Sequence, residues 1–193
     1  MIVTVRHGET EWSMSGRHTG NTDLPLTENG RRQAAALAPM FAGREFALVL
    51  CSPLLRARET CALAGFDDSR VELCDDLREW DYGAYEGLTT PEIWKTDPDW
   101  SLWRDGCPGG ESPAHVGARA DRALARLRGS DGDAIAFAHG HILRVLGARW
   151  IELPVSGGAR LFLSTGAVSE LGHERDTAVL RSWNLTPGDG PGG

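Results

Sequence analysis

Residues 2–8 read IVTVRHG, a β-branched run that ends directly in an arginine, a histidine and a glycine. Isoleucine, valine and threonine favour extended backbone, so the start of this stretch predicts a buried strand. The Ala-rich stretch 28–42 then predicts a helix, and residues 46–52 (FALVLCS) repeat the apolar strand signature. Strand, helix and strand in this order form a β-α-β unit with two parallel strands.

The rest of the chain continues this alternation. Serine followed by proline is a typical helix N-terminus, and apolar residues three and four apart indicate a helix face that packs on a sheet. Strands are therefore expected at 71–77, 134–141, 167–172 and 178–183, and helices from Ser52-Pro53 to Leu63 with Gly65 as the stop, from Ser112-Pro113 through Leu127, and over residues 142–151.

The length of 193 residues suits one domain with a sizeable core, so we expect a single domain over 1–193. A Gly-, Pro- and Trp-rich segment at about 78–111 has little periodicity and predicts a loop-dominated insertion with a short helix opened by Thr90-Pro91. The Gly- and Pro-rich tail at about 186–193 is expected to be frayed.

Apolar strands alternating with helices predict an α/β fold, with a largely parallel sheet covered by helices on both faces. In such sheets ligands bind at the carboxyl ends of the strands. His7, Arg56, Glu79 and His139 each follow a different predicted strand. Four strands therefore deliver polar side chains to one edge, which predicts a functional site there.

Each of these residues also has an ordinary structural interpretation. A histidine after a strand can be a packing residue, a metal ligand or a nucleophile. His139 and His141 form a His-x-His pair, but a metal site needs a third ligand of matching geometry. Arg56 can lie on a solvated helix face, or it can join Arg6 in a clamp, because a guanidinium binds two phosphate oxygens and stays charged.

Glu79 lies in the stretch DDLREWDYGAYEG, where acidic residues can simply be solvated. A carboxyl group close to aromatic residues and an anionic centre has its pKa raised, which suits a general acid. Asp81 and Glu86 are rivals for this role on the sequence alone.

Composition narrows the possible partners. The net charge of −7 and a pI of about 5.3 give no support to a nucleic-acid partner, which needs clustered basic residues. No run approaches the length of a membrane span and no signal peptide precedes the first strand, so we expect a cytoplasmic protein. The cysteines lack CxxC spacing and predict free thiols; they are Cys51, Cys61, Cys74 and Cys107.

Four segments in order, RHGET, SPLLRARET, LREWDYGAYEG and AHGH, together resemble the histidine phosphatase superfamily, the phosphoglycerate-mutase-like group. The resemblance covers nearly the whole chain. It is strongest to the branch of actinobacterial acid phosphatases and sedoheptulose-1,7-bisphosphatase-type sugar phosphatases. It implies a three-layer α/β/α sandwich around a mostly parallel mixed sheet.

The resemblance also implies a phosphohistidine mechanism without metal or cofactor. His7 would attack phosphorus, while Arg6, Arg56 and His139 would hold the equatorial oxygens. Glu79 would protonate the leaving group and then activate the hydrolytic water.

Further substrate contacts follow from the same resemblance. Ser13, Thr19 and Gly20 would line the pocket, and Gly140 would let main chain approach the phosphate. Arg144 would meet a second phosphate or a carboxylate, although a helix-face arginine is an equal interpretation. His18 is a further candidate.

The predicted function is hydrolysis of a small phosphorylated metabolite, a sugar phosphate or bisphosphate, with no nucleic-acid or membrane partner and a monomeric or homodimeric state. Nucleotides, cobalamin-pathway phosphates, carboxylic acid phosphates and phosphoproteins are other possible substrates. One alternative is a cofactor-dependent phosphoglycerate mutase, which the serine at position 13 and the short insertion disfavour. Another is a non-catalytic phosphate- or phosphopeptide-binding module, which would be expected to lose His7 or Glu79.

Overall fold

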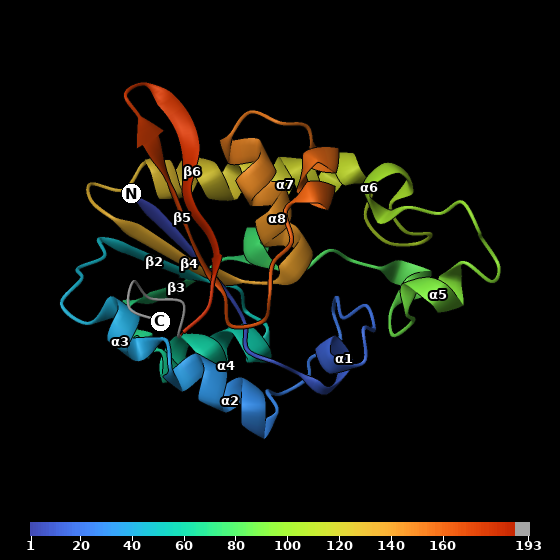
Figure 1. Cartoon of the computed structure of the whole chain (residues 1–193), viewed down its shortest axis with the longest axis horizontal. Helices are drawn as coiled ribbons and strands as arrows, with labels where there is room; N and C mark the ends of the chain where they lie inside the picture. The colour runs from blue at the N-terminus through green and yellow to red at the C-terminus, as the bar shows by residue number, and fades with distance from the viewer. Residues whose placement is uncertain (188–193) are drawn as a thin grey trace.

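The computed structural model describes residues 1–187 and contains a six-stranded sheet (Figure 1). The strands are β1 (Ile2–Arg6), β2 (Leu48–Cys51), β3 (Val71–Leu73), β4 (Ala134–Ala138), β5 (Val168–Glu174) and β6 (Thr177–Leu185). The α-helices are α1 (Glu11–Met14), α2 (Glu28–Ala35), α3 (Ala38–Phe41), α4 (Leu55–Leu63), α5 (Thr90–Ile93), α6 (Leu102–Asp105), α7 (Pro113–Arg128) and α8 (Gly140–Trp150). Short 3-10 turns are η1 (Asp68–Arg70), η2 (Asp75–Leu77), η3 (Gly83–Tyr85) and η4 (Val155–Arg160).

The strand order is β3-β2-β4-β1-β5-β6. Strands β1 to β4 are parallel to their neighbours among themselves, whereas β5 runs antiparallel to β1 and forms a hairpin with β6. The predicted mostly parallel mixed sheet and the closing hairpin are both confirmed. Because β1 to β4 are parallel, their carboxyl ends meet at one edge of the sheet.

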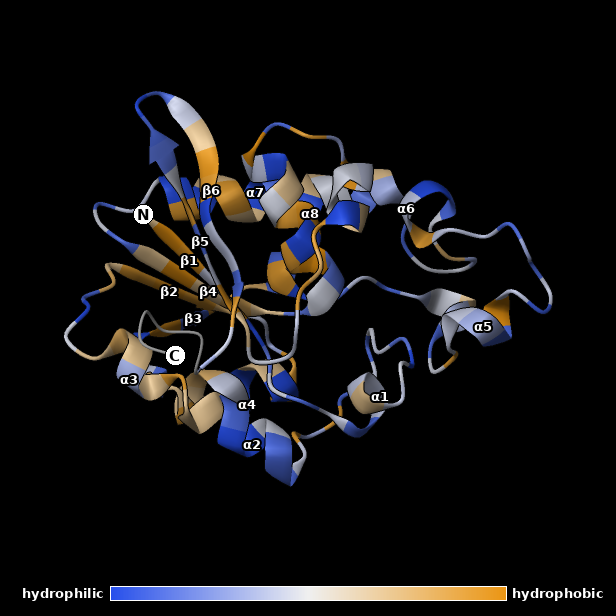
Figure 2. Cartoon of the chain, viewed as in Figure 1, coloured by the Kyte–Doolittle hydropathy of each residue, from blue (hydrophilic) through white to orange (hydrophobic). Residues whose placement is uncertain are grey.

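Helices cover both faces of the sheet (Figure 1), and β4 shows why. Its alternate residues point to opposite faces. Ala134, Ala136 and Ala138 pack with residues of α7 and α8, while Ile135 and Phe137 pack with residues of α3 and α4 and with the link between α2 and α3. Figure 2 shows the apolar residues gathered on the strands and on the inner sides of these helices. The layers are therefore α, β and α, as the resemblance implies.

Two predicted helices differ from the structure. The single helix expected at 28–42 is divided into α2 and α3, and Pro39 explains the break because it lacks an N–H and its ring clashes with the carbonyl four residues earlier. The second helix begins at Leu55 with no side-chain cap, rather than at Ser52-Pro53. The Ser52 hydroxyl is instead hydrogen-bonded to His139.

Strand β3 is also shorter than the expected 71–77, since the chain turns into η2 at Asp75. The helix stop at Gly65 is confirmed by its φ of 95°, a left-handed conformation that glycine adopts easily. Helix α7 begins with Ser112 as its N-cap, as predicted.

The segment 78–111 contains only η3, α5 and α6, joined by loops. The expected frayed tail at 186–193 lies, beyond Pro187, outside the described residues. All four cysteines are free and buried. Within residues 1–187, no helix is long and apolar enough to cross a membrane.

Phe137 supplies a test of the core between the sheet and α2–α4. It is fully buried and contacts the rings of Phe41 and Phe66. We expect Phe137→Ala to lower the free energy of unfolding by about 3–5 kcal/mol, because burial is lost and a cavity remains. The same substitution at Phe162, which is 72% exposed, should change it by less than about 0.5 kcal/mol. Urea denaturation of both variants measures the difference; equal losses would contradict this description of the core.

Candidate active site

The polar residues predicted to meet at the sheet edge do meet there. His7 follows β1, Arg56 lies on the first turn of α4 after β2, Glu79 follows β3 and η2, and His139 follows β4. The hydrogen-bond ladder continues past the strand ends: the N–H of His7 donates to the carbonyl of Ala138 over 3.0 Å. The rings of His7 and His139 therefore lie side by side, with their centroids 5.2 Å apart.

A cavity of about 240 Å³ opens at this edge, between the sheet and the segments that carry α1 and α5. It is lined by polar and charged residues from several elements. They include Arg6, His7, Ser13, Arg17, His18, Thr19, Glu79, Tyr82, Thr90, Gly140, His141 and Arg144.

His7 is buried and held in one tautomer. Its Nδ1 lies 2.7 Å from the carbonyl oxygen of Gly8, so Nδ1 carries the proton and donates it to this bond. The lone pair is then on Nε2. Burial lowers the pKa of His7 well below its ordinary value, and the positive charges of Arg56 and Arg6 lower it further. His7 is a neutral imidazole with a free nitrogen lone pair.

Arg6 lines the cavity and carries an unpaired donor. Its Nη1 donates to the carbonyl of Leu163, while its buried Nε has no hydrogen-bond partner among the described residues. Gly140 makes room for this side chain, because a Cβ at that position would lie 3.3 Å from Cζ of Arg6. An unpaired buried donor on a cation is the arrangement expected where an anion binds.

Arg56 and His139 are fully buried and are not among the residues that line the cavity; the ring of His139 lies beside that of His7. Nε of Arg56 donates to Nδ1 of His139 over 3.1 Å, so that nitrogen is unprotonated. Nε2 of His139 then carries the proton and donates to the hydroxyl of Ser52 over 2.7 Å. Burial and the neighbouring Arg56 lower the pKa of His139 well below its ordinary value. Arg56 therefore places a fixed positive charge next to His139, which is a second neutral imidazole.

The other donors of Arg56 hold a loop. Nη1 donates to the carbonyl of Thr22, and Nη2 donates to those of Thr19 and Gly20. On the opposite side of the loop, the carboxylate of Glu86 accepts the N–H groups of Gly20 and Thr22. Thr19 lines the cavity, whereas Gly20 lies in the wall behind it. Arg56 and Glu86 thus fix the loop from two sides.

Glu79 is the one of the three rival carboxylates that lines the cavity. Its Oε1 accepts the N–H groups of Trp80 and Ile142, and its Oε2 accepts that of His141, each over 2.9 Å. A carboxylate has about four acceptor positions, so Oε2 keeps one for a proton exchanged with the cavity. The Glu86 carboxylate is hydrogen-bonded to N–H groups of the loop, and that of Asp81 accepts the N–H of Gly83.

Five of the six candidate substrate contacts line the cavity: Ser13, His18, Thr19, Gly140 and Arg144. The Ser13 hydroxyl closes a capping box with Thr10 at the start of α1. Arg144 lies over the ring of Trp103 and donates to the carbonyls of Gly158 and Ala159 in η4. It is therefore an oriented side chain and not a freely solvated one.

Sequence reasoning missed the pair formed by Tyr82 and His141. Burial raises the pKa of Tyr82 well above its ordinary value and lowers that of His141 well below, so both are neutral. The Tyr82 hydroxyl and Nδ1 of His141 share a hydrogen bond of 2.6 Å. His18 stacks on Tyr82, with ring centroids 4.7 Å apart. The HGH motif drew attention to His141 only as a metal ligand, whereas the structure gives it a place in the cavity wall.

The sheet and this site have the features of phosphoryl transfer through a histidine: a neutral imidazole, buried arginines and a carboxyl group at the carboxyl ends of parallel strands. Residues 2–186 match the model of the histidine phosphatase superfamily (branch 1). The chain belongs to that superfamily, and it is a histidine-type phosphatase.

Individual relatives agree. The chain is 42% identical to an acid phosphatase of Mycobacterium tuberculosis over 189 residues, which cover 96% of this chain and 92% of that protein. It is 40% identical to the sedoheptulose 1,7-bisphosphatase of Saccharomyces cerevisiae, covering 79% of this chain and 68% of that one. The solved structure of open reading frame Rv3214 from Mycobacterium tuberculosis has a TM-score of 0.91 at 41% identity, covering 96% of this chain and 97% of that chain.

A 2,3-bisphosphoglycerate-dependent phosphoglycerate mutase of Gloeobacter violaceus is more distant, at 32% identity over 76% of this chain and 73% of that protein. The relatives at 42% and 40% identity are named as phosphatases.

The lowered pKa of His7 predicts its behaviour with pH. We expect its ring to stay neutral, with the proton on Nδ1, at pH values where the same histidine in the urea-unfolded chain is already protonated, near 6.5. Nitrogen-15 NMR of labelled histidine measures both states. Below pH 6.5 the unfolded chain binds a proton at His7 that the folded chain does not bind. The free energy of unfolding therefore decreases as pH falls below 6.5, by up to about 1.4 kcal/mol per pH unit for each histidine with a pKa lowered in this way. A folded-state titration of His7 at or above 6.5 would contradict the description.

Proposed function

We propose that the protein is a metal-independent phosphomonoesterase that hydrolyses a small phosphorylated metabolite, a sugar phosphate or bisphosphate, through a phosphohistidine intermediate. The observation that carries the proposal is the state of His7, which is neutral and buried, has a free Nε2 lone pair, and lines the same cavity as Arg6 with its unpaired donor. A neutral imidazole is a nucleophile, and a neighbouring fixed cation attracts the phosphate that it attacks.

In the first step Nε2 of His7 forms a bond to phosphorus, and the bond from phosphorus to the leaving oxygen breaks. That oxygen takes a proton from Glu79 and departs as an alcohol. Negative charge on the transferred group is offset by Arg6 in the cavity and by the hydrogen-bonded pair of Arg56 and His139 next to His7. The Gly8 carbonyl accepts from Nδ1 and keeps the imidazole in its reactive orientation.

In the second step a water molecule attacks the phosphorus of phospho-His7. Glu79, now a carboxylate, takes the proton from this water, and the electron pair of the P–N bond returns to Nε2. Inorganic phosphate leaves and both residues are restored. The same carboxyl group acts first as acid and then as base, as a two-step displacement requires.

The cavity lining other than His7 and Arg6 supports a sugar as the leaving group. It presents hydroxyl, imidazole and guanidinium groups, which hydrogen-bond to polyols and anions; they come from Arg17, His18, Thr90, His141 and Arg144. Relatives are named as a sedoheptulose bisphosphatase and a glucosyl-3-phosphoglycerate phosphatase. We assign Ser13, Thr19 and Gly140 to the phosphate end and Arg144 to a second anionic group. The proposal includes a cytoplasmic location, a monomer or homodimer, and neither nucleic acid nor membrane as partner.

The choice between phosphatase, mutase and binding module is tested with two substrates. We expect release of phosphate from p-nitrophenyl phosphate and no isomerisation of 3-phosphoglycerate primed with 2,3-bisphosphoglycerate. His7→Ala should abolish hydrolysis, because the variant lacks the group that accepts the phosphoryl group. The control His115→Ala, at an exposed histidine on α7, should leave the rate unchanged. Isomerisation would establish the mutase instead, and phosphate binding without turnover would establish the module.

The role of Glu79 is tested by the leaving group. We expect Glu79→Gln to lower kcat/KM for phenyl phosphate by about 10²- to 10⁴-fold, because its basic leaving oxygen needs a proton. The loss for p-nitrophenyl phosphate should be much smaller, since p-nitrophenolate departs without protonation. Steady-state kinetics on both esters measure the two losses. Equal losses would remove Glu79 from the general-acid role.

A further inference from the structure

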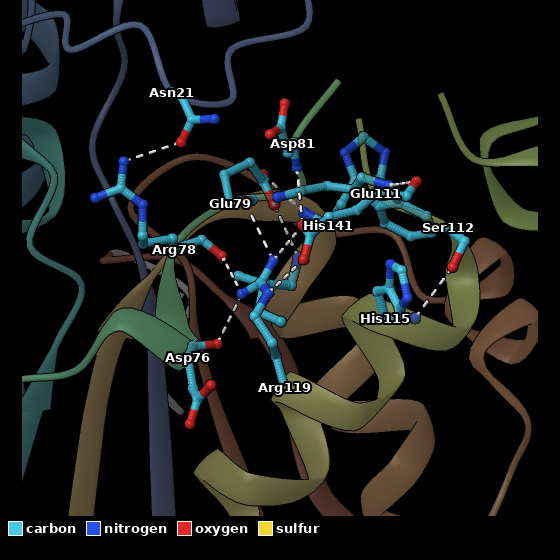
Figure 3. Close-up of polar contacts among 12 residues, drawn as sticks. Asn21, Asp76, Arg78, Glu79, Asp81, Glu111, Ser112, His115, Arg119 and His141 are labelled. Carbon is cyan, nitrogen blue, oxygen red and sulfur yellow. Dashed lines mark hydrogen bonds and ion pairs between the residues drawn. The ribbon is translucent and has the colours of Figure 1, made fainter. Parts of the chain in front are cut away.

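We propose that Arg119 is a positioning residue that sets the location of Glu79 from outside the active-site cavity. Arg119 lies on α7 and does not line that cavity. Figure 3 shows its guanidinium reaching from the helix toward Glu111 and toward the backbone that leads to Glu79. The inference rests on the proposed function, because it concerns the group that acts there as acid and base.

The first observation is the set of acceptors around the Arg119 guanidinium. Nη1 donates to the carbonyls of Asp76 and Arg78, each over 2.9 Å, and Nη2 donates to the carbonyl of Glu79 over 3.3 Å. The carbonyl of Asp76 belongs to η2, and those of Arg78 and Glu79 belong to the chain between η2 and η3, which has no regular secondary structure. One side chain therefore takes the place of a strand or helix partner for this segment.

The second observation is that Glu111 joins the same segment from its other end. Arg119 donates to Oε1 and Oε2 of Glu111, both over 2.7 Å, in a bidentate pair. Oε2 of Glu111 also accepts the N–H of Asp81, and the main-chain carbonyl of Glu111 accepts Nε1 of Trp80. The N–H of Glu111 donates back to the carbonyl of Asp81 over 2.9 Å. Glu79 thus lies between two backbone stretches that the pair fixes.

The pair is well placed to keep its geometry. The side chains of Arg119 and Glu111 are only 14% and 20% exposed. Burial alone would raise the pKa of Glu111, but Arg119 and the Asp81 N–H outweigh it, so this pKa lies below its usual value and the carboxylate stays charged. A bidentate guanidinium–carboxylate contact fixes orientation as well as distance.

The division of contacts around Glu79 shows what Arg119 does. The carboxylate is held by N–H groups at the start of α8, whereas the backbone carbonyl is held by Arg119 from α7. If the backbone moved, the carboxylate would keep its helix contacts only by turning, and Oε2 would lose its alignment with the leaving oxygen. Misplacement by about 1 Å is enough to lower a rate substantially.

The test is a double-mutant cycle with two esters. We expect Arg119→Gln to lower kcat/KM for phenyl phosphate by roughly tenfold or more and for p-nitrophenyl phosphate by less than about threefold, because only the first ester needs the proton of Glu79. In a Glu79→Gln background the same substitution should cause no further selective loss, since residues that act through one group are not additive.

The matched control is Arg122→Gln. Arg122 lies one turn further along α7 and pairs with Asp76 of the same segment, but its side chain is 59% exposed. We expect its kinetics on both esters to stay within about twofold of the original protein. If Arg119→Gln does not fold, Arg119→Lys carries the test, because it keeps the charge and loses the bidentate geometry.

Equal losses on the two esters, or the same selective loss with and without Glu79, would overturn the inference and leave Arg119 a purely structural residue. These results differ from a failure of the proposed function, in which the unsubstituted protein would hydrolyse neither ester and both proposals would fall together.

Discussion

The structure depends on a hydrogen-bond ladder that continues past the ends of the parallel strands. The N–H of His7 donates to the carbonyl of Ala138, and that of Ser52 donates to the carbonyl of Phe137. These two bonds extend the β1–β4 and β2–β4 pairings by one residue each, into the loops. The side chains that follow are thereby placed with the accuracy of a sheet, which a free loop does not provide. The side chains of His7 and Ser52 therefore start from fixed backbone positions, and other residues of the site contact them.

The site combines positive charge with neutral imidazoles in a buried place. Arg6 and Arg56 lie close to His7, and their charges, together with burial, keep His7 and His139 unprotonated. Arg56 is compensated by main-chain carbonyls rather than by a carboxylate in direct contact. Within residues 1–187 the hydrogen bonds of both guanidinium groups go to main-chain carbonyls and to His139, so their positive charge attracts an entering dianionic phosphate. The whole chain is acidic, so this concentration of positive charge is local.

Local sequence signals predicted the strands, the mostly parallel sheet and the convergence of His7, Arg56, Glu79 and His139, because apolar runs show where strands lie. They did not give every strand end, since β3 and β4 stop before the predicted residues. They did not predict which of these side chains reach the cavity. Arg56 and His139 do not line the cavity because they are held by Ser52 and by the loop at residues 19–22, contacts between segments far apart in the chain. The same reason explains the helix N-terminus placed wrongly at Ser52. The Ser52 hydroxyl is hydrogen-bonded to His139, directly after β4, and does not cap its own helix.

Thr60 of α4 accepts the N–H of Gly8, next to His7, and the same helix carries Arg56. Glu79, by contrast, is attached to α7 and α8. These helices cover opposite faces of the sheet (Figure 1). His7 and Glu79, the residues proposed as nucleophile and proton donor, are therefore supported by helices on opposite faces of the sheet. Under that proposal, substitutions in α7 or α8 would change proton transfer while the contact of α4 beside His7 stays in place, which would let this fold adapt to leaving groups of different basicity.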